Sequence, residues 1–169
     1  NRMPTIMEGN LTFQFPNAWQ ATKFDQWSFY RNQFQSVCGG AKAIDILALD
    51  PDDRLWTIEI KDYRQQRRTK TGQLAEEVAC KVRDSLAALV AAKINANDPE
   101  EKRLAQDALT AKEIRVILHL EQSMNPSKLF PRINPANIHQ KLKQLIKAID
   151  PHPLVLESAR MEGVAWTVS

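Results

Sequence analysis

Apolar residues recur at helical spacing along much of the chain. The longest such stretch covers residues 71–96 and predicts a long amphipathic helix. Residues 98–112 begin with a capping acid, a proline and two further acids, an order typical of a helix start. Residues 134–149 open with Asn-Pro and predict another helix, and an asparagine cap predicts an aromatic-rich helix over residues 17–34.

Alternating apolar and polar residues predict strands between these helices. The turn signal Asp50-Pro51-Asp52-Asp53 joins two of them into a hairpin over residues 42–62. The predicted strands occupy residues 5–15 as a short hairpin, 36–50 with a break at Gly39-Gly40, 55–62, 113–121, and the C-terminal stretches "PLVLES" and "VAWTVS". This order of helices and strands is typical of a mixed α/β layer protein.

One strand of the hairpin, "LWTIEIKDYR" over residues 55–64, carries charges among β-branched and aromatic residues. Side chains alternate between the faces of a strand, so Glu59 and Lys61 share one face. If the turn centres near Asp52, opposed residue numbers sum to about 104, and Asp45 lies across from Glu59. Two carboxylates and an ammonium group are therefore expected to converge.

Two explanations fit these charges. In the first, they protect an edge strand from unwanted pairing. In the second, Asp45 and Glu59 hold Mg²⁺, which prefers one or two carboxylates plus waters and phosphates. The ion would polarise a phosphodiester and lower the pKa of a bound water, while Lys61 orients that water or steadies the charge of the transition state. Asp52 is excluded as a partner because it lies in the turn, roughly 20 Å along the strand from Glu59.

The pattern Asp45-x13-Glu59-x-Lys61 resembles the PD-(D/E)xK nuclease superfamily, over residues 17–121. The resemblance implies a restriction-endonuclease-like α/β fold, in which a central mixed sheet is flanked by helices in the order helix, three strands, helix, strand. The helix at 98–112 would be an insertion, and a helix and strands are added at the C-terminus. No flanking recognition domain and no Gln-x3-Tyr signature of the RecB-like branch are visible.

What the resemblance implies for function is a metal-dependent DNA endonuclease. Asp45 and Glu59 would bind Mg²⁺, with Mn²⁺ able to substitute, and the backbone carbonyl of Ile60 would be a further ligand. Lys61 would assist the nucleophile. Asp25, the one acid available on the predicted first helix, is a candidate for an additional ligand.

A basic run follows the strand, with Arg64, Arg67, Arg68 and Lys70 close together in "KDYRQQRRTKTG". These side chains are candidates for phosphate contacts along a nucleic-acid backbone, which carry no sequence information. The alternative is a solvated basic loop without a partner. Beside the carboxylate pair, the two interpretations are balanced.

Length and composition add only broad limits. The chain of 169 residues, with a net charge of +3, predicts one domain over 1–169, with a core over about 17–121 and a C-terminal extension over about 122–169. No apolar run is long enough for a membrane span. Two cysteines without metal-like spacing favour a reducing compartment, the cytoplasm. DNA is the expected partner, and a homodimer would allow both strands to be handled.

Two other functions compete with the nuclease. One is a nuclease-fold domain that binds nucleic acid or a protein partner without catalysis. The other is an unrelated α/β interaction domain whose edge strand happens to carry Glu59 and Lys61, which would place Asp45 far from Glu59 or on the other face.

Overall fold

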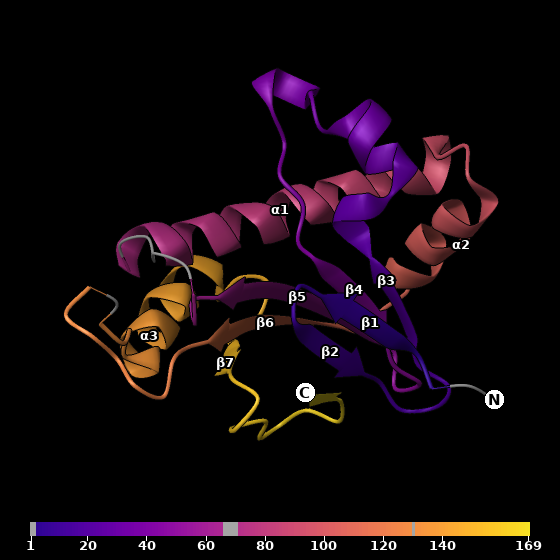
Figure 1. Ribbon diagram of the computed structural model, residues 1–169. Helices are drawn as coiled ribbons and strands as arrows, with labels where there is room; N and C mark the ends of the chain where they lie inside the picture. Colours follow the sequence, from indigo (N-terminus) through magenta and orange to yellow (C-terminus); the bar gives the residue numbers. More distant parts are fainter. Residues whose placement is uncertain (1–2, 66–70, 130) are drawn as a thin grey trace.

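The strands of the protein form two sheets in the computed structural model, which describes residues 3–65, 71–129 and 131–169 (Figure 1). The larger sheet has five strands in the order β3-β4-β5-β6-β7, and the smaller has three in the order β1-β2-β8. The strands are β1 (Thr5–Glu8), β2 (Leu11–Gln14), β3 (Gln20–Lys23), β4 (Ile46–Leu49), β5 (Arg54–Asp62), β6 (Glu113–Glu121), β7 (Leu154–Leu156) and β8 (Thr167–Val168). The predicted mixed α/β architecture is confirmed.

Alternation along β5 separates two apolar cores on the two faces of the large sheet. Leu55 packs with the helices in one core, whereas Trp56 and Ile58 pack against the small sheet in the other. The helical core is formed with α1 (Thr71–Asn95), α2 (Pro99–Ala108) and α3 (Pro135–Ile146). The chain therefore builds layers of helices, large sheet and small sheet, and the even and odd positions of β5 face different layers.

The predicted helices after residue 70 are confirmed at nearly the expected positions. The side chain of Asp98 accepts hydrogen bonds from the backbone N–H groups of Glu100 and Glu101, so the expected cap of α2 is present. Two apolar residues of α1, Val90 and Ile94, are exposed. None of the helices in the described ranges is both long and apolar enough to cross a membrane.

Residues 17–34 do not form the predicted helix. They contain β3, a 3₁₀ turn at Phe24–Gln26 and a π-helical turn at Tyr30–Phe34. Contacts with distant parts of the chain override the local helix preference, because residues 20–23 pair with β4. The helical turn that begins near Ser28 is capped by a side chain from the first turn of α2. The carboxylate of Glu101 accepts hydrogen bonds from the backbone N–H groups of Ser28 and Phe29 at 3.0 and 2.9 Å.

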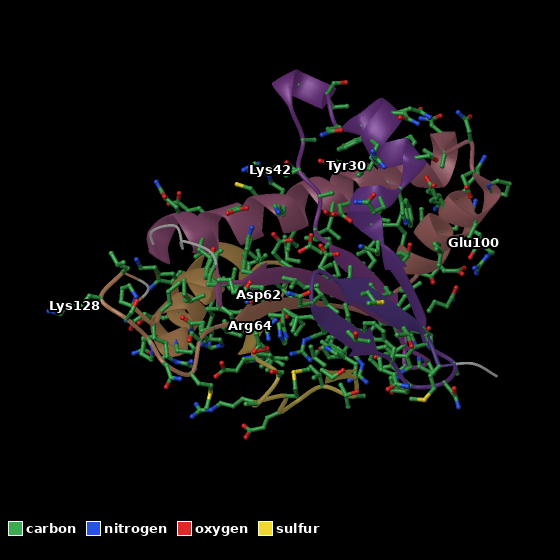
Figure 2. The ribbon with its side chains drawn as sticks, viewed as in Figure 1. Tyr30, Lys42, Asp62, Arg64, Glu100 and Lys128 are labelled. Carbon is green, nitrogen blue, oxygen red and sulfur yellow. The ribbon has the colours of Figure 1, made fainter. Side chains whose placement is uncertain are left out.

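The predicted strand over residues 36–45 is also wrong, because a 3₁₀ turn at Val37–Gly39 interrupts it and the strand itself begins at Ile46. Cys38 and Gly40 have positive φ values of 50° and 135°, which a continuous strand does not allow. Tyr30 (Figure 2) fixes the end of the loop over residues 36–41, since its hydroxyl donates to the carbonyl of Ala41 at 2.9 Å.

A buried carboxylate organises the turn between β4 and β5. Asp50 accepts hydrogen bonds from the backbone N–H groups of Asp52 and Arg54 and from the Arg54 guanidinium and the Trp56 indole. Burial alone would raise the pKa of Asp50, but the donors from Trp56 and Arg54 outweigh it and hold that pKa below the usual value. One side chain therefore closes the turn and anchors the strand that follows.

We expect Asp50→Ala to lower the free energy of unfolding by about 2–4 kcal/mol, because the buried Trp56 N–H loses its acceptor. Denaturant titration of both proteins measures the change. The matched control is Asp52→Ala, whose side chain is 79% exposed and which should change stability by less than about 0.5 kcal/mol. Equal effects of the two substitutions would contradict this role of Asp50.

Candidate cation and nucleic-acid site

The hairpin register brings Asp45 and Glu59 together as predicted. Ile46 pairs with Ile58 and Leu47 with Thr57, so opposed residue numbers sum to 104 and Asp45 lies across from Glu59. The Asp45 Oδ2 atom accepts a hydrogen bond of 2.8 Å from the backbone N–H of Ile60. β5 is a central strand, paired with β4 and β6, so the explanation of Glu59 as an edge-strand charge is wrong.

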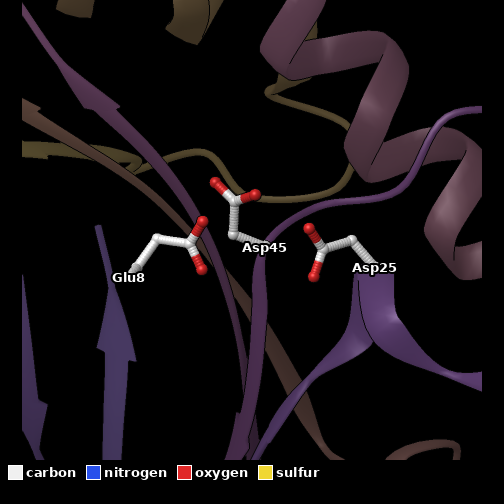
Figure 3. Close-up of side chains that lie close together, drawn as sticks. All are labelled: Glu8, Asp25 and Asp45. Carbon is white, nitrogen blue, oxygen red and sulfur yellow. The ribbon is translucent and has the colours of Figure 1, made fainter.

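Three carboxylates from separate elements converge at the start of β4 (Figure 3). One oxygen each from Glu8, Asp25 and Asp45 lies within 4.8 Å of the others. Asp25 reaches this point because the backbone N–H of Phe24 donates to the carbonyl of Asp45 at 2.9 Å. We call Glu8, Asp25 and Asp45 the carboxylate triad.

Lys23 fixes the position of Glu8 in the triad. Its ammonium group lies 3.1 Å from a carboxylate oxygen of Glu8 and donates to the carbonyl of Met7 at 3.1 Å. Lys23 is the last residue of β3 and pairs with Ile46 of β4. A residue of the large sheet therefore holds the small sheet's acid beside Asp45.

Glu59, which lies across the hairpin from Asp45, belongs to an ion-pair network with α1. The Glu59 Oε2 atom is 2.6 Å from the ammonium group of Lys81 and 3.4 Å from that of Lys61. Lys61 also pairs with Glu77 at 2.9 Å. The Glu59 side chain is only 1% exposed, so its charge depends on these lysines for compensation.

The pKa values of this site respond to burial and to like charges. Burial, reinforced by the charge of Glu59, raises the pKa of Asp45 to about 8. Burial and the neighbouring Asp45 also raise the pKa of Asp25. For Lys61 and Lys81, burial alone would lower the pKa, but their acidic partners outweigh it and raise both values. The lysines are therefore charged at neutral pH, whereas Asp45 holds a proton.

The residues fit a hard divalent cation. Two buried carboxylate oxygens, Oδ1 of Asp25 and Oε1 of Glu59, have no hydrogen-bond donor in the described chain, and Oε2 of Glu8 has only its ion pair with Lys23. The nearly fully buried Glu59 lies close enough to Asp45 for its charge to raise the pKa of Asp45. Convergent carboxylate oxygens are the ligands that Mg²⁺ and Mn²⁺ prefer. A ligand role for the carbonyl of Ile60 stays a prediction.

Sequence reasoning missed three residues of this site, Glu8, Glu77 and Lys81. Glu77 and Lys81 are spaced i, i+4 on α1 beside its buried face, a signal that was available. Glu8 had no local signal, because it reaches Asp45 only through the packing of one sheet on the other.

An open cleft of about 680 Å³ adjoins the acids and is lined by the β1–β2 turn, by residues 60–65 and by Glu77. Asp62 and Arg64 lie at its edge, at the end of β5, and form an ion pair of 2.6 Å (Figure 2). Of the predicted basic group, Arg64 thus lines this cleft, where it pairs with Asp62. Arg67, Arg68 and Lys70 lie outside the described residues.

Comparison with known proteins gives one partial similarity. Over 160 aligned residues the chain is 36% identical to a cysteine–tRNA ligase of Neisseria meningitidis serogroup A / serotype 4A. The alignment covers 76% of this chain and only 23% of that ligase. No family model matches the chain. No solved structure matches it either.

This similarity corrects the predicted function. The relative is a cysteine–tRNA ligase and not a nuclease, so the prediction of a Mg²⁺-dependent DNA endonuclease is wrong, and so is the classification of the chain among nucleases. That the chain is an enzyme, that it is a homodimer and that it belongs to the PD-(D/E)xK superfamily stay predictions.

Asp45→Asn should make stability less dependent on pH. The pKa of Asp45 is about 8 in the folded protein and 3.8 ordinarily. The stability that protonated Asp45 contributes is therefore complete below pH 3.8 and is lost as the pH rises through about 8. Asparagine carries no charge and still accepts from Ile60. The quantity to compare is the free energy of unfolding of Asp45→Asn minus that of the native chain, measured without added cation. This difference should be about 1–3 kcal/mol larger at alkaline than at acidic pH.

Denaturant titration across this pH range measures the effect. Asp52→Asn, at the exposed turn, is the control and should keep the native pH profile. Parallel profiles for Asp45→Asn and the native chain would contradict the titration of Asp45.

Lys81→Met should destabilise the protein by about 2–4 kcal/mol, because it leaves the Glu59 carboxylate buried with only the longer contact to Lys61. Adding Glu59→Gln should recover a large part of that loss, since the uncompensated charge is then gone. A double-mutant cycle by denaturant unfolding measures the coupling. Additive effects of the two substitutions would contradict the ion pair.

Proposed function

We propose that this chain is a nucleic-acid-binding domain that holds a divalent cation, Mg²⁺ or Mn²⁺, at the carboxylate triad of Glu8, Asp25 and Asp45 and binds RNA phosphates through it. The observation that carries the proposal is the convergence of the carboxylate triad beside the buried, donor-free Oε1 atom of Glu59. Acids placed this closely repel one another unless protons or cations separate them. A divalent cation would offset the repulsion between these carboxylates.

The surroundings of the acids support phosphate binding. Lys61 is 21% exposed and lies at the cleft, and Arg64 lies at the edge of the same cleft. A guanidinium group suits bidentate phosphate contacts, and an ammonium group supplies a compact charge. The cation would neutralise the carboxylates and add an attractive charge for phosphate oxygens.

RNA is the proposed nucleic acid because the relative is named as a ligase for tRNA. The chain spans 23% of that ligase, so the ligase reaction as a whole is not carried over. A domain of this size that binds RNA, with the cation at its contact point, agrees with both the similarity and the geometry.

We also propose that the core has the restriction-endonuclease-like arrangement, as a scaffold for binding. Its support is the antiparallel run β3-β4-β5, followed by α1 and by β6, which pairs with β5 in parallel. The helix α2 is then the insertion, as the sequence predicts. The strand that begins this core, β3, comes from a segment that was predicted to be helical.

The test is RNA binding, measured by fluorescence anisotropy with a labelled tRNA, in Mg²⁺ and in EDTA. We expect Mg²⁺ to strengthen binding at least roughly tenfold, which corresponds to about 1.4 kcal/mol. Asp45→Asn should abolish this gain because it removes a carboxylate ligand while keeping the acceptor for Ile60.

Binding of Mn²⁺ alone, followed by electron paramagnetic resonance, tests the cation site independently, and Asp52→Asn is the control variant in both assays. RNA affinity that is equal in Mg²⁺ and EDTA, or Mn²⁺ binding that survives Asp45→Asn, would overturn the proposal.

A further inference from the structure

The cleft beside the carboxylates has the size of a ligand pocket. Its volume of about 680 Å³ lies within the roughly 300–1,000 Å³ typical of small-molecule sites. It is bounded on one side by Glu8, Gly9 and Asn10 of the β1–β2 turn and on the other by the end of β5 and the turn after it. A Cβ atom added to Gly9 would meet no atom within 4 Å, so this wall of the cleft is open.

The charges of the cleft decide what it accepts. The residues that line it carry more carboxylates than cationic groups. The carboxylates belong to Glu8, Asp62 and Glu77, and the cations to Lys61 and Arg64. A phosphate group therefore meets net repulsion until a divalent cation occupies the acids, after which both the cation and Arg64 attract it.

An aromatic side chain lies at the same place. The backbone of Tyr63 is fixed by a hydrogen bond of 2.8 Å from its N–H to the carbonyl of Glu121. Its ring is half-buried against the helical core and also lines the cleft, so one part of it is packed and another is accessible. Tyr63 also lies close enough to Lys61 to contribute to the raised pKa of that ammonium group.

Exposed amides complete the lining. Asn10 of the β1–β2 turn and Gln65 after β5 both line the cleft, and each offers both a hydrogen-bond donor and an acceptor. This combination suits the edge of a nucleobase better than a further phosphate. Tyr63 and the two amides line the same cleft as Lys61 and Arg64, so a phosphate and the base attached to it can be bound there at the same time.

We infer that this cleft binds one unpaired nucleotide of an RNA, with its phosphate toward the cation, Lys61 and Arg64, and its base against Tyr63 between Asn10 and Gln65. The inference rests on the proposed function and deepens it by naming the class of RNA. Bases in a double helix are stacked and their edges are paired, whereas unpaired bases can stack on an aromatic side chain. Single strands, loops and overhanging ends are therefore preferred over blunt duplexes.

The experiment compares a short labelled single-stranded RNA with a blunt duplex of the same sequence, both in Mg²⁺, by fluorescence anisotropy. We expect the single strand to bind more tightly. Tyr63→Leu should weaken single-strand binding roughly fivefold to a hundredfold, the range of one base stacking on an aromatic ring, and should leave duplex binding unchanged. Tyr63→Phe, which keeps the ring, should recover the affinity that Tyr63→Leu loses.

Asn10→Ala and Gln65→Ala change exposed side chains and test the inference even if Tyr63→Leu folds poorly. Each should weaken single-strand binding roughly fivefold, as expected for one hydrogen bond. The control is Arg83→Ala, on α1 in a separate groove beside α3, which should bind like the native chain.

Cation-dependent binding of both RNAs with equal affinity, unaffected by these three substitutions, would overturn the inference and leave the proposed function standing. Absence of cation-dependent binding to either RNA would overturn the proposed function itself. The two failures are thus distinguishable.

Discussion

The register of the β4–β5 hairpin is the constraint on which the candidate site depends. A slip of one residue would turn Glu59 away from the helical layer and bring Ile58 or Ile60 in its place. The turn residue Asp50 opposes such a slip, because it accepts hydrogen bonds from the turn and from Trp56 two residues into β5. Asp50 lies five residues along the chain from Asp45, which is roughly 16 Å at about 3.3 Å per residue. The turn at one end of the hairpin therefore sets the geometry of the acids at the other end.

The same register creates an electrostatic problem that the rest of the fold answers. Asp45 and Glu59 face each other in a buried setting, where neither carboxylate is well solvated. Lys81 and Lys61 compensate Glu59, and a proton compensates Asp45. A divalent cation would compete with that proton and with the lysines for the same oxygens. The described ion pairs therefore compensate the charge of Glu59, whereas a cation would have to displace the proton of Asp45.

The sequence predicted the parts of this site that depend on local periodicity. Alternation along β5 and the turn at Asp50 were enough to place Asp45 opposite Glu59 and Glu59 beside Lys61, and helical spacing located α1. It did not predict β3, because the preference of residues 20–23 is overridden by pairing with β4, a contact between distant parts of the chain. Function was predicted least well, since a carboxylate pair and a lysine favour cation chemistry without specifying what it is used for.

The small sheet contributes to the site as well as to the core. It buries Leu11 and Phe13 against the large sheet, which any apolar cover would do. Its β1–β2 turn, however, also supplies Glu8 to the triad and Asn10 to the cleft. Lys23 couples these two roles, because it pairs with Glu8 from a strand whose register is tied to β4. The acids and the cleft are therefore positioned by one set of contacts, so a cation at the acids and a nucleotide in the cleft would be held by parts of the fold that cannot move independently.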